Sequence, residues 1–178
     1  MNIEYEIRVL EINTDEIIQK LETLGAKKVG EWLQKRYVYD TNPKNENAWF
    51  RLRTNGIETT LTYKNVEKNT IDGTKELEII VSDFEKTNDM LKLMGYHHRG
   101  YQENKRIRYM LDDIEIDIDS WPLIPTYMEI EGKNEIEINT ILEKLNVPEE
   151  KITALNCQDI YKDIYNIDID SIKELSFK

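Results

Sequence analysis

The opening of the chain, Glu4-Tyr5-Glu6-Ile7-Arg8, alternates charged and less polar residues, and this alternation constrains the fold more than any other feature. In an extended strand, successive side chains point to opposite faces, so the charged residues share one face and the others share the opposite face. The same arrangement returns at residues 76–79 and 129–131, each time followed by a helix-like apolar pattern. The recurrence indicates an internally duplicated strand–helix unit with a partial third copy.

The composition of the chain excludes several classes of protein. We expect one domain over 1–178, with a strand–helix core over about 1–146 and a helical tail over about 148–178. The formal net charge of -11 argues against binding to nucleic acid or to an anionic membrane. The single cysteine, Cys157, rules out an intrachain disulfide and a cysteine-based zinc cluster. With neither an apolar run of about 18 residues nor a signal pattern, a cytoplasmic protein is expected.

Alternating segments separated by turn signals predict about eight strands. They cover about residues 2–12, 30–40, 49–53, 58–64, 76–79, 104–111, 114–119 and 127–131. Helices are predicted from Thr14, as N-cap, to Gly25, from Ser82-Asp83 to about residue 94, and over about 139–146. Phe84, Met90, Leu91 and Met94 are expected to pack the second helix. Together these elements predict an antiparallel sheet with one face covered by helices.

Charged side chains of both signs gather on one face of the predicted strands. They are Glu4, Glu6, Arg8, Arg36, Asp40, Arg51, Arg53, Lys64, Glu76, Glu78, Arg106, Arg108, Asp117, Asp119, Glu129 and Glu131. The ordinary interpretation is the solvated face of an open sheet, where ion pairs contribute little. However, arginine suits bidentate binding of phosphate, and paired carboxylates repel unless cations lie between them. Eight strands also suffice to close a barrel around one small ligand, which here would be a polyphosphate with a divalent metal.

This ordered set of residues resembles the CYTH superfamily, also called triphosphate tunnel metalloenzymes. Glu4-x-Glu6-x-Arg8 is similar to the family's Glu-x-Glu-x-Lys signature. The resemblance continues to about Leu145 through Arg51-x-Arg53, Lys64, Glu76 and Glu78, Lys105-Arg106, Asp117-x-Asp119 and Glu129-x-Glu131. It implies an α+β fold in which an eight-stranded antiparallel β-barrel, the triphosphate tunnel, is flanked by helices.

The resemblance also implies roles for the charged residues. Metal ligands would be Glu4, Glu6, Glu76, Glu78, Asp117, Asp119, Glu129 and Glu131, and their hard oxygen atoms select Mg2+ or Mn2+. The triphosphate would lie against Arg8, Arg36, Arg51, Arg53, Lys64, Lys105, Arg106 and Arg108. The catalytic group would be Glu4, Glu6, Arg8, Glu129 and Glu131. Arg8 departs from the family's usual lysine, and because arginine stays protonated it cannot act as a base.

Three functions fit such a clamp. The first is divalent-metal-dependent hydrolysis of inorganic triphosphate, thiamine triphosphate or a nucleoside triphosphate such as ATP, by water attack on the terminal phosphorus. The second is a class IV adenylyl cyclase, in which the ribose 3′-hydroxyl attacks the α-phosphorus of ATP and releases pyrophosphate. The third is a non-catalytic module that binds a polyphosphate or nucleotide. Hydrolysis is preferred because the clamp is visible in the sequence and no base-recognition feature is.

A few aromatic residues lie outside the charged set. Trp121, in the rigid loop 121–125, is expected to cap the core rather than to form an apolar wall at a tunnel mouth, and Trp49 shares the face of Arg51. Tyr161 and Tyr165 are four residues apart and are expected to pack the tail against the barrel. Cys157 is expected to be a small buried residue without chemistry.

Overall fold

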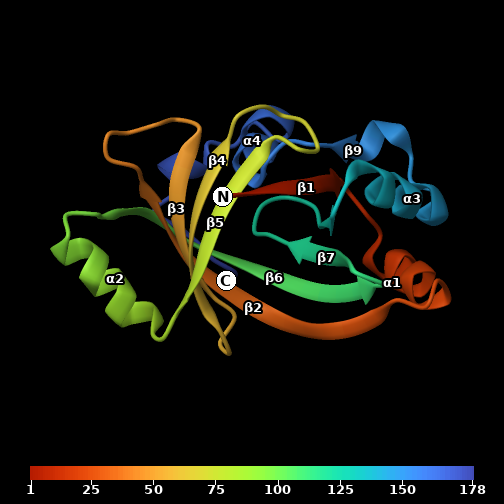
Figure 1. The fold of residues 1–178 in the computed structure, drawn as a ribbon, viewed down its shortest axis with the longest axis horizontal. Coiled ribbons are helices and arrows are strands. Elements are labelled where there is room, and N and C mark those ends of the chain that lie inside the picture. Colours follow the sequence, from red (N-terminus) through yellow and green to blue (C-terminus); the bar gives the residue numbers. More distant parts are fainter.

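The computed structural model describes residues 1–178, and its centre is a closed barrel of eight antiparallel strands (Figure 1). The strands are β1 (Asn2–Val9), β2 (Lys27–Asp40), β3 (Ala48–Thr54), β4 (Thr59–Val66), β5 (Thr74–Val81), β6 (His98–Leu111), β7 (Ile114–Ser120) and β8 (Tyr127–Gly132). Around the barrel they follow the order β1-β5-β4-β3-β2-β6-β7-β8, and β8 returns to β1. The predicted eight-stranded antiparallel barrel is confirmed.

The element order follows the repeat seen in the sequence. β1, α1 (Thr14–Thr23) and β2 form one strand–helix–strand unit, and β5, α2 (Phe84–Leu93) and β6 form a second. β8 and α3 (Glu135–Leu145) form the partial third unit. The two long strands β2 and β6, with 14 residues each, pair with one another along most of their length. None of the helices combines the length and the apolar character needed to cross a membrane.

The helix ends differ slightly from the prediction. α1 is capped by Asn13 rather than Thr14, since the Asn13 side chain accepts a hydrogen bond of 3.2 Å from the backbone N–H of Glu16. Both residue types serve as N-caps, which made the two positions hard to separate in the sequence. Gly25 follows the helix with a positive φ of 86°, as a C-terminal stop requires. α3 begins at Glu135, four residues before the predicted start.

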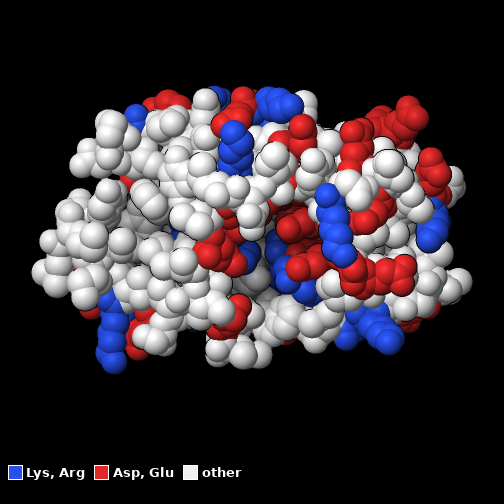
Figure 2. Space-filling model, viewed as in Figure 1, with Lys and Arg blue, Asp and Glu red and all other residues white.

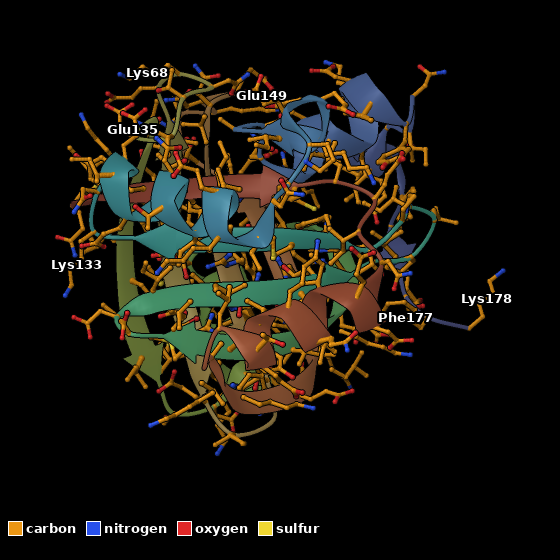
Figure 3. All side chains as sticks on the ribbon, turned by 90° about the vertical axis from the view of Figure 1, so that its right-hand side faces the viewer. Lys68, Lys133, Glu135, Glu149, Phe177 and Lys178 are labelled. Carbon is orange, nitrogen blue, oxygen red and sulfur yellow. The ribbon has the colours of Figure 1, made fainter.

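The main apolar core lies outside the barrel, because the inward face of the strands is charged. It fills the space between α1, α3 and the outer faces of β1, β6, β7 and β8, the side of the molecule seen in Figure 3. Leu21 of α1, Ile138 of α3, and Ile116 and Ile130 of the barrel are fully buried there. Burying a side chain of this kind contributes roughly 1.5–3 kcal/mol. These contacts fix the strands that carry the carboxylates.

The packing predicted for α2 is wrong at Met90 and Met94. Met90 and Met94 are 59% and 64% exposed, although Phe84 stacks on Tyr37 with ring centroids 4.9 Å apart. α2 projects from one end of the elongated molecule (Figure 1), so it has few neighbours to pack against. It is held instead through its buried residue Asn88, whose side-chain oxygen accepts a 3.0 Å hydrogen bond from the Tyr39 hydroxyl.

The tail after Pro148 consists of short pieces rather than one helix. The short strand β9 (Ile152–Thr153) pairs with β1, and β10 (Glu174–Leu175) pairs in parallel with β6. Between them lie α4 (Cys157–Asp159), a π-helical turn over 160–164 and a 3-10 turn over 169–171. These turns form a second apolar cluster, whose members include Leu10, Trp121, Tyr127, Ile160, Tyr161 and Ile169.

The two tail tyrosines differ in their packing. Tyr161 is fully buried, and its hydroxyl donates a 2.5 Å hydrogen bond to the Pro122 carbonyl, so its predicted packing is confirmed. Tyr165 is half-buried and donates a 3.2 Å hydrogen bond to the Glu11 carboxylate.

One join in the barrel is short. β1 and β5 are paired only between Asn2–Glu4 and Thr74–Glu76. From Leu77 onward β5 pairs on one side alone, with β4. The barrel is therefore closed by three residue pairs at this seam.

Candidate functional site

The barrel encloses a charged tunnel with a cavity of about 230 Å³. Figure 2 shows acidic and basic side chains gathered around the hollow where it opens to the surface. Most of the residues predicted from the sequence line it: Glu4, Glu6, Arg8, Arg36, Arg51, Arg53, Lys64, Glu76, Glu78, Arg106, Arg108, Asp119, Glu129 and Glu131. Asp117 is buried within the wall. Alternation within each strand thus brings together charges that are far apart in the sequence.

Lys105 is the exception, and its predicted place on the triphosphate path is wrong. Its neighbour Arg106 points into the tunnel, so Lys105 points to the outside of β6, where it is exposed. Its ammonium group lies 4.7 Å from the centre of the Phe177 ring.

One wall of the tunnel consists of matched ion pairs. The β6–β7 register places Arg106 opposite Asp119 and Arg108 opposite Asp117. Arg106 Nε lies 2.7 Å from Asp119 Oδ1, and its Nη1 lies 2.5 Å from Asp117 Oδ2. Arg108 makes a bidentate pair with Asp117, at 2.8 and 2.7 Å. Burial disfavours the charge of Arg106, but Asp119 and Asp117 together raise its pKa well above the ordinary value. Both aspartates, predicted as metal ligands, therefore serve as partners of arginine in this structure.

Arg8 is also paired with carboxylates, those of Glu6 and Glu129. Its Nη2 lies 2.8 Å from a Glu6 oxygen and 2.6 Å from a Glu129 oxygen, and Nη1 donates a 3.0 Å hydrogen bond to the Leu155 carbonyl. The side chain is buried. Two carboxylates neutralise this guanidinium, so it ties β1 to β8 and to the tail rather than offering a free positive charge.

The adjoining wall, formed by β2 and β3, carries arginines whose carboxylate neighbours are absent or distant. Arg51 lies 3.6 Å from Glu78 and 3.9 Å from Glu76, beyond hydrogen-bond distance. Arg36 lies directly across from Arg53 in the β2–β3 register. The Arg36 guanidinium contacts only the neutral side chains of Gln34 and Asn104, and it lies 4.5 Å from the centre of the Trp121 ring. The nearest carboxylate to Arg53 is Glu78, at 3.8 Å, which is too far for a hydrogen bond.

The pKa values of Arg36 and Arg53 show that burial close to other guanidiniums disfavours their charged forms. Burial, followed by the charges of Arg51 and Arg106, lowers the pKa of Arg36 to about 10. Burial and the neighbouring guanidiniums of Arg51, Arg106 and Arg36 lower the pKa of Arg53 well below its ordinary value. Like charges opposite one another destabilise a sheet. We refer to Arg36, Arg51 and Arg53 as the cationic cluster, and an anion bound there would relieve their repulsion.

A surplus of negative charge lies at the other end of the tunnel. Lys64 Nζ contacts Glu4 at 2.9 Å and Glu76 at 2.8 Å, so one ammonium serves two carboxylates. Lys64 and Arg51 outweigh burial and lower the pKa of Glu76 to about 2. Burial, with repulsion from Glu6 and Glu76, raises the pKa of Glu4 to about 8.

Glu131 adds to this surplus. Burial and the charge of Glu129 raise the pKa of Glu131 to about 7, with further repulsion from Glu115 and Glu6. We refer to Glu4, Glu6, Glu76 and Glu131 as the acidic end.

The acidic end fits a divalent cation by its chemistry. Its donors are all carboxylate oxygens, which Mg2+ and Mn2+ prefer, and a cation would remove the repulsion that raises the pKa values of Glu4 and Glu131. No three acidic side chains of the structure stand together in ready metal-binding geometry. Lys64 and Arg8 draw several of these carboxylates toward themselves, so metal binding would require the side chains to turn.

Several residues outside the charged set also line the tunnel. Trp121 caps the second apolar cluster, as expected, and also walls the cavity. Trp49 lines the cavity on the face that alternation gave it. Cys157 lines the cavity as well, and burial raises the pKa of its thiol to about 11. The remaining tail residues, Asn156, Gln158, Ile169 and Asp170, carry no periodic signal in the sequence.

Arg99 was missed for a physical reason. Val38 pairs with Gly100 and Tyr39 pairs with His98, so Arg99 is the extra residue of a β-bulge. A bulge breaks the period of two and turns a side chain toward the other face. Counting from Arg106 therefore gives the wrong face for Arg99.

Comparisons with known proteins agree with this geometry. The "putative adenylate cyclase" of Methanocaldococcus jannaschii is 27% identical over 165 residues, which cover 90% of this chain and 92% of that protein. Among solved structures, the PH1012 protein of Pyrococcus horikoshii matches with a TM-score of 0.75 at 23% identity, over 86% of this chain and 96% of that one.

A Hippeastrum protein, described as a "putative adenylyl cyclase" with a dominant triphosphatase activity, matches with a TM-score of 0.60. Its identity is 13%, over 94% of this chain and 97% of that one. The CYTH domain model matches residues 2–155, which is most of the chain. The protein belongs to the CYTH domain family.

Proposed function

We propose that this protein is a divalent-metal-dependent hydrolase of a triphosphate compound. The observation that carries the proposal is the separation of unmatched charge inside one cavity. In the cationic cluster, Arg36 has no carboxylate partner, and Arg51 and Arg53 approach Glu78 only to 3.6 and 3.8 Å. The acidic end lacks enough cationic partners. A polyphosphate and a divalent cation, bound side by side, would neutralise both surpluses at once.

The cationic cluster would bind and orient the phosphate chain. Arginine suits this role because its planar fork donates two parallel hydrogen bonds to phosphate oxygens. A metal ion at the acidic end, when bound, would neutralise phosphate charge and activate water. Water would attack the terminal phosphorus, the bond to the bridging oxygen would break, and orthophosphate and the diphosphate product would leave. Positioning and charge stabilisation supply most of the catalysis in such phosphoryl transfers.

A class IV adenylyl cyclase is the second candidate. The Methanocaldococcus relative carries the name of an adenylate cyclase, whereas the description of the Hippeastrum protein gives triphosphatase activity as dominant. The same clamp would serve attack by the ribose 3′-hydroxyl of ATP on its α-phosphorus. We prefer hydrolysis because the amide side chains of Asn156 and Gln158, which face the cavity, are already hydrogen-bonded within the protein and so are not free to recognise a base.

A non-catalytic binding module is the third candidate. Anion binding alone would not need the acidic end, which costs stability in the absence of a cation.

The proposal is tested by analysing the products formed from tripolyphosphate, thiamine triphosphate and ATP with Mg2+ or Mn2+. Orthophosphate release is expected, with a loss of at least about 100-fold in the Glu4→Gln, Glu131→Gln double variant. The control variant is Lys105→Ala, on the outside of the barrel. Cyclic AMP and pyrophosphate from ATP would establish the cyclase instead. Metal-dependent binding without turnover would favour the binding module.

A further inference from the structure

The C-terminal tail lines one end of the tunnel cavity. The family match ends at residue 155, yet the cavity is lined beyond that point by Asn156, Cys157, Gln158, Ile169 and Asp170. We propose that this tail seals the mouth, that a latch formed by Arg99, Gln158 and Asp170 holds it shut, and that this closure restricts the site to compact triphosphates. The inference about substrates rests on the proposed function, whereas the closure itself does not.

The latch connects the tail to the barrel rim. Arg99 Nη1 lies 3.1 Å from an Asp40 oxygen, and its Nε lies 3.3 Å from an Asp170 oxygen. Arg99 Nη2 also donates a 3.1 Å hydrogen bond to the Gln158 side-chain oxygen. The Gln158 amide then donates a 2.7 Å hydrogen bond to Asp170. One guanidinium thus joins the end of β2 to two separate turns of the tail.

The β-bulge explains how Arg99 reaches the tail. With regular pairing its side chain would follow the face opposite to Arg106 and Arg108. As the extra residue between His98 and Gly100, it is turned toward the cavity and lines it. Bulges of this kind commonly re-aim a side chain beside a functional site.

The tail is anchored on both sides of the part that covers the mouth. Before it, the Leu155 carbonyl accepts a hydrogen bond from Arg8, and β9 pairs with β1. After it, β10 pairs with β6. Between these anchors, Tyr161 and Ile169 are buried in the second apolar cluster. The segment is therefore packed as a wall, and the latch is its polar attachment at the rim.

The tail seals the mouth without offering groups to a ligand. The Asn156 side chain is occupied at both ends, since its amide donates to the Asp159 carboxylate at 2.7 Å and its oxygen accepts from the Asp159 backbone at 3.1 Å. Gln158 is likewise occupied at both ends by Arg99 and Asp170. The face of Trp121 is covered by Arg36. An organic ring at this end would therefore meet amide groups that are already engaged within the protein.

A compact substrate follows from this arrangement. Phosphate groups can bind at the cationic cluster, but a bulky group cannot extend past them through the sealed mouth. Tripolyphosphate should therefore bind better than ATP, and opening the latch should narrow that difference. The latch residues act on specificity through the tail and are positioning residues.

Cys157 provides a direct probe of closure because it is the only cysteine of the chain, belongs to the tail and faces the cavity. The experiment measures its rate of labelling by a maleimide in the full-length protein. Asp170→Ala and Arg99→Met are expected to label at least about tenfold faster than wild type, because labelling follows the population of open tail. Arg99→Lys, which keeps the charge beside Asp170, should lie in between. Asp163→Ala, an exposed tail position with no partner in the structure, should match wild type.

The second arm measures binding of tripolyphosphate and ATP by calorimetry with Mg2+. The ratio of ATP affinity to tripolyphosphate affinity should rise at least about tenfold in Asp170→Ala and in Arg99→Met, and should stay constant in Asp163→Ala. Unchanged labelling in both latch variants would overturn the latch. Faster labelling with an unchanged ratio would overturn its role in specificity. Failure of wild type to bind either ligand would refute the proposed function, while the labelling arm would still decide the closure.

Discussion

The two walls of the tunnel use the same residue types in opposite ways. On the β6–β7–β8 wall, Arg106 and Arg108 each face buried carboxylates at hydrogen-bond distance. On the β2–β3 wall, Arg36 and Arg53 face one another. Arg36 contacts only neutral amides, and Arg53 lies 3.8 Å from its nearest carboxylate, Glu78. The arginine charges of the first wall are neutralised within the protein, and those of the second wall are not. The difference teaches that a ligand site in a charged interior is indicated by the charges that lack partners within the protein, rather than by the presence of charges alone.

The largest expected effect comes from breaking the matched wall. Arg106→Met would leave Asp119, Asp117 and Glu129 buried without their shared cation. Removing one partner of a buried ion pair costs about 3–5 kcal/mol, so the free energy of unfolding should fall by that amount in urea titrations. Arg53→Met is the matched control on the other wall and should cost less than about 1 kcal/mol. Equal losses in the two variants would contradict the distinction between the walls.

The second effect concerns ligand binding at the cationic cluster. Arg53→Met should weaken tripolyphosphate binding about 10- to 100-fold, because a charge-assisted hydrogen bond contributes roughly 1.5–3 kcal/mol. Arg36→Met should act in the same direction. Calorimetric titration with tripolyphosphate measures the change, and Arg53→Lys should recover part of the affinity. An unchanged affinity in both methionine variants would place the anion elsewhere.

The third effect is a dependence of stability on pH at the acidic end. The pKa values of Glu131, about 7, and Glu4, about 8, lie above the ordinary value for glutamate. The native state therefore keeps protons that the unfolded chain releases, and the free energy of unfolding falls as pH rises from about 5 to about 8. A loss on the order of 1–3 kcal/mol is expected for the metal-free protein in urea titrations across this range.

Glu131→Gln sharpens that measurement. The variant should lose much of the pH dependence up to about pH 7 while keeping the part that belongs to Glu4. A stability that rises with pH over this window would contradict the charge surplus at the acidic end.

The smallest effect is expected on the outside of the barrel. Lys105→Ala removes an exposed ammonium that lies over Phe177. The free energy of unfolding should change by less than about 0.5 kcal/mol, and tripolyphosphate affinity should stay the same. A clear loss of affinity would show that the outer face of β6 takes part in binding.

The sequence predicted most of the inward residues because a period of two persists along an unbroken strand, whereas the closed barrel was implied by the resemblance to the CYTH superfamily. Glu4, Glu6 and Arg8, for example, lie on the predicted face. The prediction failed at Arg99, where a bulge interrupts the period, and at Lys105, which was grouped with Arg106 although neighbours in a strand point to opposite faces.

The pairing of charges could not be predicted in the same way. Whether an arginine meets a carboxylate depends on the register between strands that are distant in the sequence. Arg106 lies opposite Asp119, whereas Arg36 lies opposite Arg53, and nothing within either strand distinguishes the two cases. The structure of the tail could not be predicted from the sequence either, since its short turns are held by long-range contacts and show no repeating pattern.

The short seam between β1 and β5 gives the barrel an uneven resistance to opening. Three residue pairs join these strands, whereas β2 and β6 are joined by twelve. Local opening follows the free energy of the bonds that must break, so the amides of Asn2–Glu4 and Thr74–Glu76 should take up deuterium well before those at the centre of β6. The barrel is therefore expected to open first between β1 and β5, beside Glu4 and Glu76. These two strands carry three residues of the acidic end, so local opening would separate its carboxylates first.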